Sequence, residues 1–283
     1  MLGPPLGTGL RSAPPEQKLR IGCSGWSYQD WAGPFYPKSA QPKDFLRLYS
    51  SVFNTVEIDS SFYRIPNRFM ISLWKKNTPE GFLFTAKFPK EITHEAKLKG
   101  VSDTLSYFYG TLEGFEDKLG ALIIQLPPSF KYDGGMPVLE GFLSEVSPNF
   151  RHAIEFRHKS WFREDVYQLL QKHNVANCWS INQYLETPTE RTANFIYARM
   201  VGDRAITKFT GKQRDTTEEM KKMHTAIEAN LDSVDEAFVF FNNHFAGFGP
   251  ESVNEFRRLA GLMEMDWSGL SGQASRQRSL EEF

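Results

Sequence analysis

The stretch HAIEFRH at residues 152–158 decides how the chain folds. Its first five residues, His152–Phe156, form a short β-prone run that predicts a buried strand. Helix-length segments with one polar and one apolar face precede it at Pro137–Val146 and follow it at Ser160–His173. A strand flanked by helices is typical of a parallel sheet, because parallel strands need a crossover connection between them.

The same alternation recurs along the chain. Eight β-rich runs are expected, at Leu19–Ser24, Thr55–Ile58, Phe82–Phe88, Ala121–Gln125, His152–Phe156, Val175–Trp179, Phe195–Met200 and Ala237–Phe241. Helices are expected at Pro42–Ser51, Asn67–Asn77, Ser102–Phe115, Pro137–Val146, Ser160–His173, Thr216–Leu231 and Glu251–Met263. Asn67, Ser102 and Ser160 are the candidate N-caps. The pattern predicts a single-domain α/β fold, a TIM-type (β/α)8 barrel. An open doubly wound sheet is the alternative, but its Gly-rich phosphate turn is missing.

The barrel domain is expected to span residues 18–265. Residues 1–17 lack the apolar region of a signal peptide and predict a flexible N-terminal extension, and the polar residues 266–283 predict a flexible tail. The net charge is -1, which is not typical of a general nucleic-acid binder. No apolar run is long enough to span a membrane, and the two cysteines, Cys23 and Cys178, imply no disulfide framework. We therefore expect a cytoplasmic protein, whose oligomeric state the sequence leaves open.

Polar side chains follow the expected carboxyl ends of the strands, where the catalytic residues of such barrels lie. Glu57 and Asp59 are two positions apart and therefore share one face, as do Glu155 and Arg157. The remaining strand-end residues are Lys87, Gln125, His158, Tyr197, Arg199, Asn242, Asn243 and His244. If the barrel forms, these side chains should converge on one mouth.

Two interpretations of the charged residues in this set remain open. Charged side chains are rarely buried unless paired, so Glu57 and Glu155 could form a structural ion-pair network with Lys87, Arg157 and Arg199. Alternatively, the three cations exceed what the acids require and form a ligand site. Arg and Lys suit phosphate or carboxylate groups, so an anionic small molecule is the expected partner, with Gln125, Asn242 and Asn243 as further ligand-binding residues.

Four residues are candidate catalytic groups. His158 and His244 could transfer protons, because only His titrates near neutrality without perturbation, and Glu57 and Glu155 could act as acids or bases. A divalent metal at Glu57 and Glu155 is conceivable, but no metal-type spacing occurs and nearby cations would compete for the carboxylates. No nucleotide-cofactor motif is present, so the cofactor is unknown. His94 is expected to lie apart from the site.

Aromatic residues follow several strands. Trp26, Tyr28 and Tyr63 are expected to face a ligand, since exposed rings can stack on sugars or bases. Trp31 and Trp161 are expected to pack in the core.

The resemblance to a known family rests on motifs that occur in order: IGCSGWSY at 21–28, VEIDSSFYRIP at 56–66, FTAKFP at 84–89, QLPPSF at 125–130, AIEFRH at 153–158 and FNNH at 241–244. Together they resemble the YecE-like family, domain of unknown function 72, over about Leu19 to Met263. The resemblance implies a TIM-type barrel. A likeness to endonuclease IV and sugar isomerase barrels has prompted a proposal of nucleic-acid binding or processing for the family, which is an analogy of fold.

One departure from the family pattern affects the expected site. The family usually has an Arg-x-His-Gly run at the end of the seventh strand, where this chain reads Arg199-Met200-Val201-Gly202. If the missing His were essential, this chain would bind without turnover or act on a different substrate.

Three functions follow from these observations. The first is an enzyme of the hydrolase or isomerase/lyase type that acts on a phosphorylated or other anionic substrate at the mouth of the barrel. The second is a nucleic-acid-binding module, with metal-dependent phosphodiester processing as a variant, for which the basic loop from Arg204 to Arg214 could contact phosphates. The third is a small-molecule sensor or carrier without catalysis.

Overall fold

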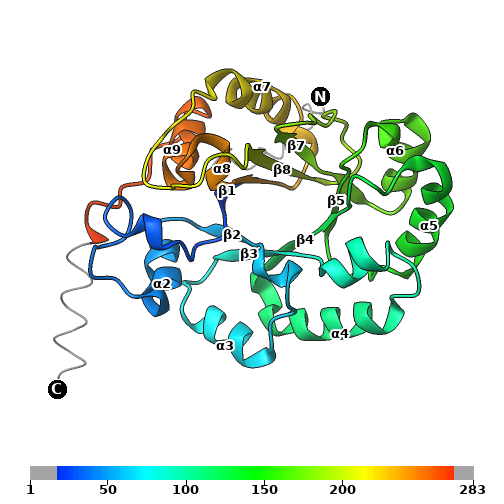
Figure 1. The fold of residues 1–283 in the computed structure, drawn as a ribbon, viewed down its shortest axis with the longest axis horizontal. Coiled ribbons are helices and arrows are strands. Elements are labelled where there is room, and N and C mark those ends of the chain that lie inside the picture. The colour runs from blue at the N-terminus through cyan, green and yellow to red at the C-terminus, as the bar shows by residue number, and fades with distance from the viewer. Residues whose placement is uncertain (1–17, 271–283) are drawn as a thin grey trace, which may run out of the picture.

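The computed structural model describes residues 18–270 and shows a single α/β domain built around one parallel sheet (Figure 1). The predicted TIM-type barrel is confirmed. The strands are β1 (Leu19–Ser24), β2 (Thr55–Ile58), β3 (Leu83–Lys87), β4 (Leu119–Gln125), β5 (His152–Glu155), β6 (Val175–Asn177), β7 (Trp179–Asn182), β8 (Phe195–Gly202) and β9 (Glu236–Phe241). Their order in the sheet is β6-β5-β4-β3-β2-β1-β9-β8-β7. Because all pairs are parallel, the carboxyl ends lie at one end of the barrel.

The described residues form nine strands, so the expected number of eight was wrong. The sixth expected strand, Val175–Trp179, is divided at Cys178, whose N–H donates to Ile154 O at 2.8 Å. Its first part, β6, pairs with β5, and its continuation, β7, pairs with β8. One extended segment therefore changes neighbour along its length, which nearly closes the sheet into a cylinder and interrupts the regular strand at the crossing point.

Helices surround the sheet, as Figure 1 shows. They are α2 (Phe45–Ser50), α3 (Arg68–Lys76), α4 (Ser102–Leu112), α5 (Tyr132–Glu145), α6 (Glu164–Lys172), α7 (Thr217–Glu228), α8 (Asn243–Ala246) and α9 (Gly249–Leu259), with short 3₁₀ and π turns between them. Each of the seven expected helical segments overlaps one of these helices, although α5 and α9 begin before the expected Pro137 and Glu251. The short α8 was not expected. Within residues 18–270, no helix is long and apolar enough to cross a bilayer.

Only one of the three expected N-caps was correct. The Asn67 side chain accepts the Met70 N–H at 2.8 Å and caps α3. Ser102 is already the first residue of α4. The N-cap expected at Ser160 was also wrong, because α6 begins four residues later, at Glu164. The Ser160 hydroxyl instead accepts the Tyr132 N–H at 3.0 Å.

Aromatic side chains fill the layer between the sheet and the helices. Trp31 and Trp161 are fully buried there, as predicted. A second, smaller group of side chains fills the inside of the cylinder, with Ala121, Ile123, Ala153, Tyr197, Phe238 and Phe240 among its members. The barrel interior below its mouth is therefore packed, and the space for a ligand lies at the ends of the strands.

Part of the expected C-terminal tail packs against the barrel. Trp267 Nε1 donates to Pro34 O at 3.0 Å, and Leu270 is buried. Residues 271–283 of that tail, and the expected extension at residues 1–17, lie outside the described residues.

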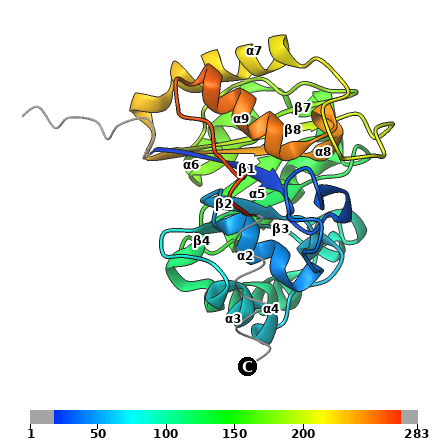
Figure 2. The ribbon, with the colours of Figure 1, turned by 90° about the vertical axis from the view of Figure 1, so that its left-hand side faces the viewer.

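In Figure 2 the loop after β8 and helix α8 lie at the end of the barrel to which β1 points.

Candidate functional site

A cavity of about 360 Å³ opens at the carboxyl ends of the strands. Residues from six strands or the loops that follow them line it: Asp59, Tyr63, Lys87, Gln125, Arg157, Arg199, Val201, Arg204, Asn242 and His244. Eight of these were expected from the sequence, and the fold brings them together because parallel strands deliver alternate side chains to a common mouth. Four of the lining side chains are cationic at neutral pH, and one is a carboxylate.

Arg199 forms the floor of the cavity and is held by two buried carboxylates. Its Nη2 donates to Glu57 Oε1 at 2.6 Å, and its Nη1 donates to Glu155 Oε2 at 2.7 Å. A weaker contact of 3.2 Å joins Nη2 to Asp59 Oδ1 at the rim. Arg199 is 3% exposed, and both glutamates are fully buried. The guanidinium is thus fixed in one orientation, and the carboxylates of Glu57 and Glu155 beneath it balance its positive charge.

Glu155 is ionised in this arrangement. Its second oxygen, Oε1, lies 2.8 Å from Arg157 Nη2. Burial raises the pKa of Glu155, but the charges of Arg157 and Arg199 together outweigh burial and lower the pKa to about 2. Arg157 reaches the cavity from the same strand end, so Glu155 positions two of the cavity's guanidinium groups at once.

Glu57 has the opposite electrostatic balance. Its Oε2 accepts the Tyr197 hydroxyl at 2.7 Å, and that hydroxyl lies 2.9 Å from Thr85 Oγ1. Burial raises the pKa of Glu57 and prevails over the attraction of Arg199, and Asp59 raises the pKa further. Two buried carboxylates therefore flank one Arg with their pKa values displaced in opposite directions.

Lys87 is a cation of the cavity that lacks a close counter-ion. Its Nζ lies 4.1 Å from the centroid of the Phe62 ring, and no carboxylate of the described residues lies within 4.0 Å of it. Burial lowers the pKa of Lys87, and Arg199 adds to that effect. His94 packs edge-on against the same Phe62 ring, at 4.8 Å between centroids, and does not line the cavity.

The ring of His244 has a defined tautomer. Its Nδ1 lies 2.7 Å from Ile206 O, and because a carbonyl only accepts, Nδ1 carries the proton. The neutral ring therefore presents an unprotonated Nε2. Asn242 lies beside it, and its Oδ1 accepts the His244 N–H at 3.0 Å, which fixes the backbone at the start of α8. His244 is thus suited to take up a proton at the mouth.

Besides the buried Glu57 and Glu155, four expected site residues do not line the cavity. His158 Nδ1 accepts the Ser160 N–H at 3.2 Å and caps a short turn. The Asn243 side chain accepts from Trp31 Nε1 at 3.1 Å and ties α8 to the core.

The other two are aromatic. Trp26 packs edge-on against Trp74 of α3, and Tyr28 donates to Ser24 O at 2.7 Å. Their order in the sequence placed them near the mouth, but their side chains pack against neighbouring parts of the chain instead.

Tyr197 was expected among the strand-end residues, but its contact with Glu57 was not. Tyr197 stands two positions before Arg199 and therefore on the same face of β8, and this spacing was the available signal for that contact. Arg204 was considered as part of a basic loop, and Val201 as a departure from a family pattern, but neither was expected in the cavity. No local signal placed Arg204 there, because its position depends on how the loop after β8 folds back over the mouth.

Two of the four cations in the basic loop after β8 are paired with acids. Lys212 Nζ lies 2.7 Å from Glu255 Oε1, and Arg214 pairs with Glu219. Arg204 turns to the cavity, and Lys208 is exposed. The four cations therefore do not form the continuous unpaired stripe that a phosphate backbone requires.

The residues of the mouth offer poor ligands for a metal ion. Within residues 18–270, no group of three or more His, Cys, Asp and Glu side chains is arranged to hold one. At the position considered from the sequence, Glu57 and Glu155 direct carboxylate oxygens at Arg199 nitrogens. A guanidinium in that place competes with a metal for the same oxygens.

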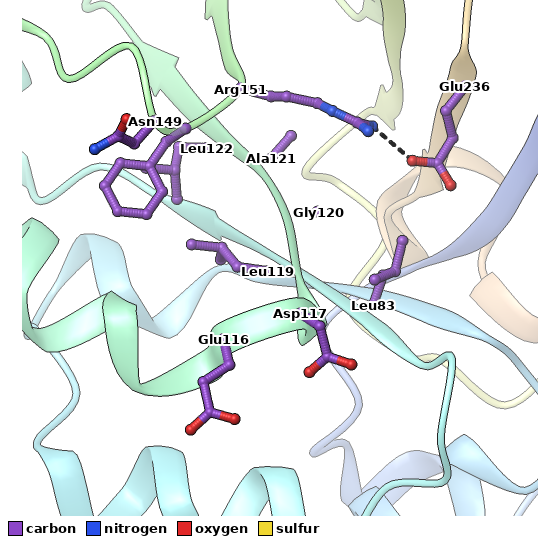
Figure 3. A pocket seen from close by; sticks show the side chains of 11 residues that line it. Leu83, Glu116, Asp117, Leu119, Gly120, Ala121, Leu122, Asn149, Arg151 and Glu236 are labelled. Carbon is purple, nitrogen blue, oxygen red and sulfur yellow. Dashed lines mark hydrogen bonds and ion pairs between the residues drawn. The ribbon is translucent and has the colours of Figure 1, made fainter.

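A second cavity, of about 240 Å³, lies at the opposite end of the barrel (Figure 3). It is lined by the first residues of β3, β4 and β9, and Figure 3 shows Arg151 reaching across to Glu236. Both oxygens of Glu236 are engaged, one by Arg151 and one by Arg20, each at 2.6 Å. The charges there satisfy one another, which is typical of a stabilising contact at the amino end of such a barrel.

Comparisons with known proteins agree with the sequence motifs. The family model described as "Protein of unknown function DUF72" matches residues 20–277. The chain is 28% identical over 144 residues to "UPF0759 protein YecE" of Escherichia coli K12, and the match covers 51% of this chain and about half (50%) of that relative. It is 24% identical over 281 residues to "UPF0759 protein YunF" of Bacillus subtilis, with 89% and 97% of the two chains covered.

A solved structure extends the likeness to the fold. The crystal structure of a DUF72 family protein from Thermotoga maritima superposes with a TM-score of 0.76 at 27% identity, and covers 86% of this chain and 99% of that one. The family model matches well over half of the chain, and the shared barrel is consistent with it. The chain therefore belongs to the family described as protein of unknown function DUF72.

Proposed function

We propose that the chain is an enzyme that acts on a small phosphorylated or otherwise anionic substrate bound at the carboxyl mouth of the barrel. The observation that carries this proposal is an excess of positive charge without counter-ions in a cavity that already holds fixed guanidinium groups. Among the described residues, neither Lys87 nor Arg204 has a carboxylate within 4.0 Å, and both line the cavity. An anion placed there would supply the missing negative charge.

The buried acids support the binding site in this proposal. Glu57 and Glu155 are fully buried and engaged with Arg199, so we assign them to hold that guanidinium rather than to contact the substrate. A fixed guanidinium loses little conformational freedom when it binds an anion, which strengthens binding. The proposal therefore revises the catalytic role expected for these two residues into a positioning role.

His244 is the proposed proton carrier. Its Nδ1 is committed to Ile206 O, which leaves Nε2 as the basic atom of a ring that lines the cavity. A positioned base of this kind typically contributes about 10²–10⁴-fold to a rate. His158 is not assigned this role, because its Nδ1 is occupied in the turn at Ser160.

The cavity's size and the partly neutralised basic loop favour a small substrate over a nucleic acid. A volume of about 360 Å³ lies within the range of small-molecule sites, about 300–1,000 Å³. Two of the four cations in the basic loop are already paired with acids. A binding module for nucleic acid would instead need several unpaired cations along one face.

Titration with inorganic phosphate tests the binding part of the proposal. We expect the wild-type protein to bind phosphate and Lys87→Met and Arg204→Ala to bind it about 5–10-fold more weakly, since one charged contact is worth about 1 kcal/mol or more. Lys208→Met is the matched control, because Lys208 lies on the same loop but does not line the cavity. The proposal fails if wild-type protein binds no anion, or if the control weakens binding as much as Lys87→Met.

Turnover tests the catalytic part. The protein would be screened against a panel of phosphorylated and carboxylated small molecules, and His244→Gln compared with His158→Gln on any substrate found. We expect the His244 variant to lose at least about 10²-fold in kcat with little change in phosphate affinity, and the His158 variant to retain most of the rate. Binding of anions without turnover of any panel member would favour a carrier or sensor.

A further inference from the structure

The backbone that carries the Lys87 amine is anchored to the ends of two strands. Lys87 is the last residue of β3, and its backbone N–H donates to Ser61 Oγ at 3.0 Å. The Ser61 hydroxyl lies in turn 2.7 Å from Lys87 O and 2.8 Å from Ile58 O, so it joins the end of β3 to the end of β2. The side chain extends from this anchored backbone into the cavity and is partly exposed there.

The surroundings of the amine disfavour its charged form. Its Nζ lies over the Phe62 ring, and no hydrogen-bond acceptor of the described residues lies within reach. Burial lowers the pKa of Lys87. Among the charged groups that face it, Arg199 of β8 lowers the pKa further, whereas Asp59 after β2, Glu155 of β5 and Glu57 of β2 oppose the shift without reversing it.

The charge of the Lys87 amine also affects the imidazole of His94. Burial lowers the pKa of His94, and the charges of Lys87 and Arg157 lower it further. His94 therefore adds no positive charge near neutrality, but its ring confines Phe62, the ring over which the amine lies. A lysine desolvated beside other cations is the arrangement that activates an amine as a nucleophile.

We propose that Lys87 Nζ is a nucleophile that forms an imine with the carbonyl carbon of a small anionic aldehyde or ketone. The geometry that carries this is an amine without an ion pair, which extends from an anchored backbone over Phe62 into a cavity whose other cations can hold the anionic end of such a molecule. The inference rests on the proposed function and narrows its substrate class to anionic carbonyl compounds.

The step balances without an oxidant or reductant. The nitrogen lone pair attacks the carbonyl carbon, and the C=O π pair moves to oxygen. Nitrogen gives up two protons, which can pass one after the other through His244 Nε2 to that oxygen. The first transfer gives a carbinolamine, and with the second the oxygen leaves as water while the C=N bond forms. Amine and carbonyl thus give one imine and one water, and His244 ends in its starting state.

Reductive trapping tests the inference. The purified protein would be incubated with glyoxylate, which carries an aldehyde and a carboxylate, and with sodium cyanoborohydride as the hydride source, and labelled lysines located by peptide mass spectrometry. We expect label at Lys87 several-fold above that at exposed lysines, and protection by inorganic phosphate. The inference is overturned if the label is spread evenly over exposed lysines or if Lys87 stays unlabelled.

Two substitutions separate the amine's chemistry from its charge. Lys87→Arg keeps a cation but cannot form an imine, so it should lose the label and still bind phosphate. Lys87→Met should lose the label and also bind phosphate about 5–10-fold more weakly. Lys208→Arg is the control and should label at Lys87 as wild type does. If phosphate binds and Lys87→Met weakens binding, but Lys87 is never labelled, the imine is refuted and the proposed function stands. If phosphate does not bind at all, both fail.

A second measurement reports on the amine without any carbonyl. Trinitrobenzenesulfonate reacts only with neutral amines and carries negative charge, so Lys87 should react several-fold faster than Lys208 at pH 8, with phosphate slowing Lys87 alone. Equal reaction rates at Lys87 and Lys208 would contradict the lowered pKa of Lys87, which supports the inference.

Discussion

Replacement of Glu155 by Gln should destabilise the protein by about 3 kcal/mol at pH 7. The pKa of Glu155 falls from 4.5 to about 2 in the folded protein, where Arg157 and Arg199 lie against its two oxygens. Each tenfold change in proton affinity corresponds to about 1.4 kcal/mol, so the fold favours the ionised carboxylate by about 3 kcal/mol. This lies at the lower end of the cost of breaking a buried ion pair, about 3–5 kcal/mol.

The direction of the Glu155 pKa shift determines how this loss of stability depends on pH. Because the folded-state pKa lies below that of the unfolded chain, the stabilisation is complete above about pH 4.5 and is lost as the pH falls towards 2. The deficit of Glu155→Gln should therefore be full at pH 7 and about half as large at pH 3. Urea unfolding followed by tryptophan fluorescence at both pH values measures it, and the melting temperature at pH 7 should fall by about 6–12 °C.

Glu57→Gln is the matched comparison, because Glu57 is equally buried and contacts the same Arg199. Burial raises the pKa of Glu57, so the fold favours its neutral, protonated form. The neutral amide of Gln resembles that form, and Glu57→Gln should therefore lose less stability than Glu155→Gln. Equal losses for the two variants would refute the reasoning. So would a deficit of Glu155→Gln that stays the same at pH 3, since that would show a packing effect.

Three further outcomes follow from the structure. Gly202→Ala should cost about 2 kcal/mol or more in a thermal melt, because Gly202 has φ +75° and a Cβ there would lie 2.2 Å from His244 O. Stability should decline as the pH falls from about 6.5 towards 4, because burial lowers the pKa of His152 to about 4. In a His152→Gln variant, with Tyr109 still beside the side chain, the free energy of unfolding should depend less on pH over that range. Trp267→Ala should lose about 1–2 kcal/mol and expose the segment after α9 to faster limited proteolysis, since it removes a buried ring face and a hydrogen bond.

The strand positions could be predicted because each strand carries its own local signal. β1 and β2 begin and end where the sequence places them, and the alternation with helices predicted parallel pairing throughout. What the pattern could not show is the division of the sixth expected strand at Cys178, because that depends on which neighbours the strand meets when the sheet closes. Helix starts were less predictable for a similar reason: Ser160 resembles an N-cap, but it contacts Tyr132 of another helix.

The amino-acid sequence by itself determined that polar side chains gather at the mouth, because alternation along a strand fixes the face on which each residue lies. Only the tertiary structure decided which of these residues neutralise one another and which remain for a ligand. Glu57 and Glu155 lie beneath Arg199, whereas Lys87 and Arg204 are left without close counter-ions. The partner of a charge depends on its depth in the barrel and on loops from distant segments, and the spacing of residues along the chain specifies neither.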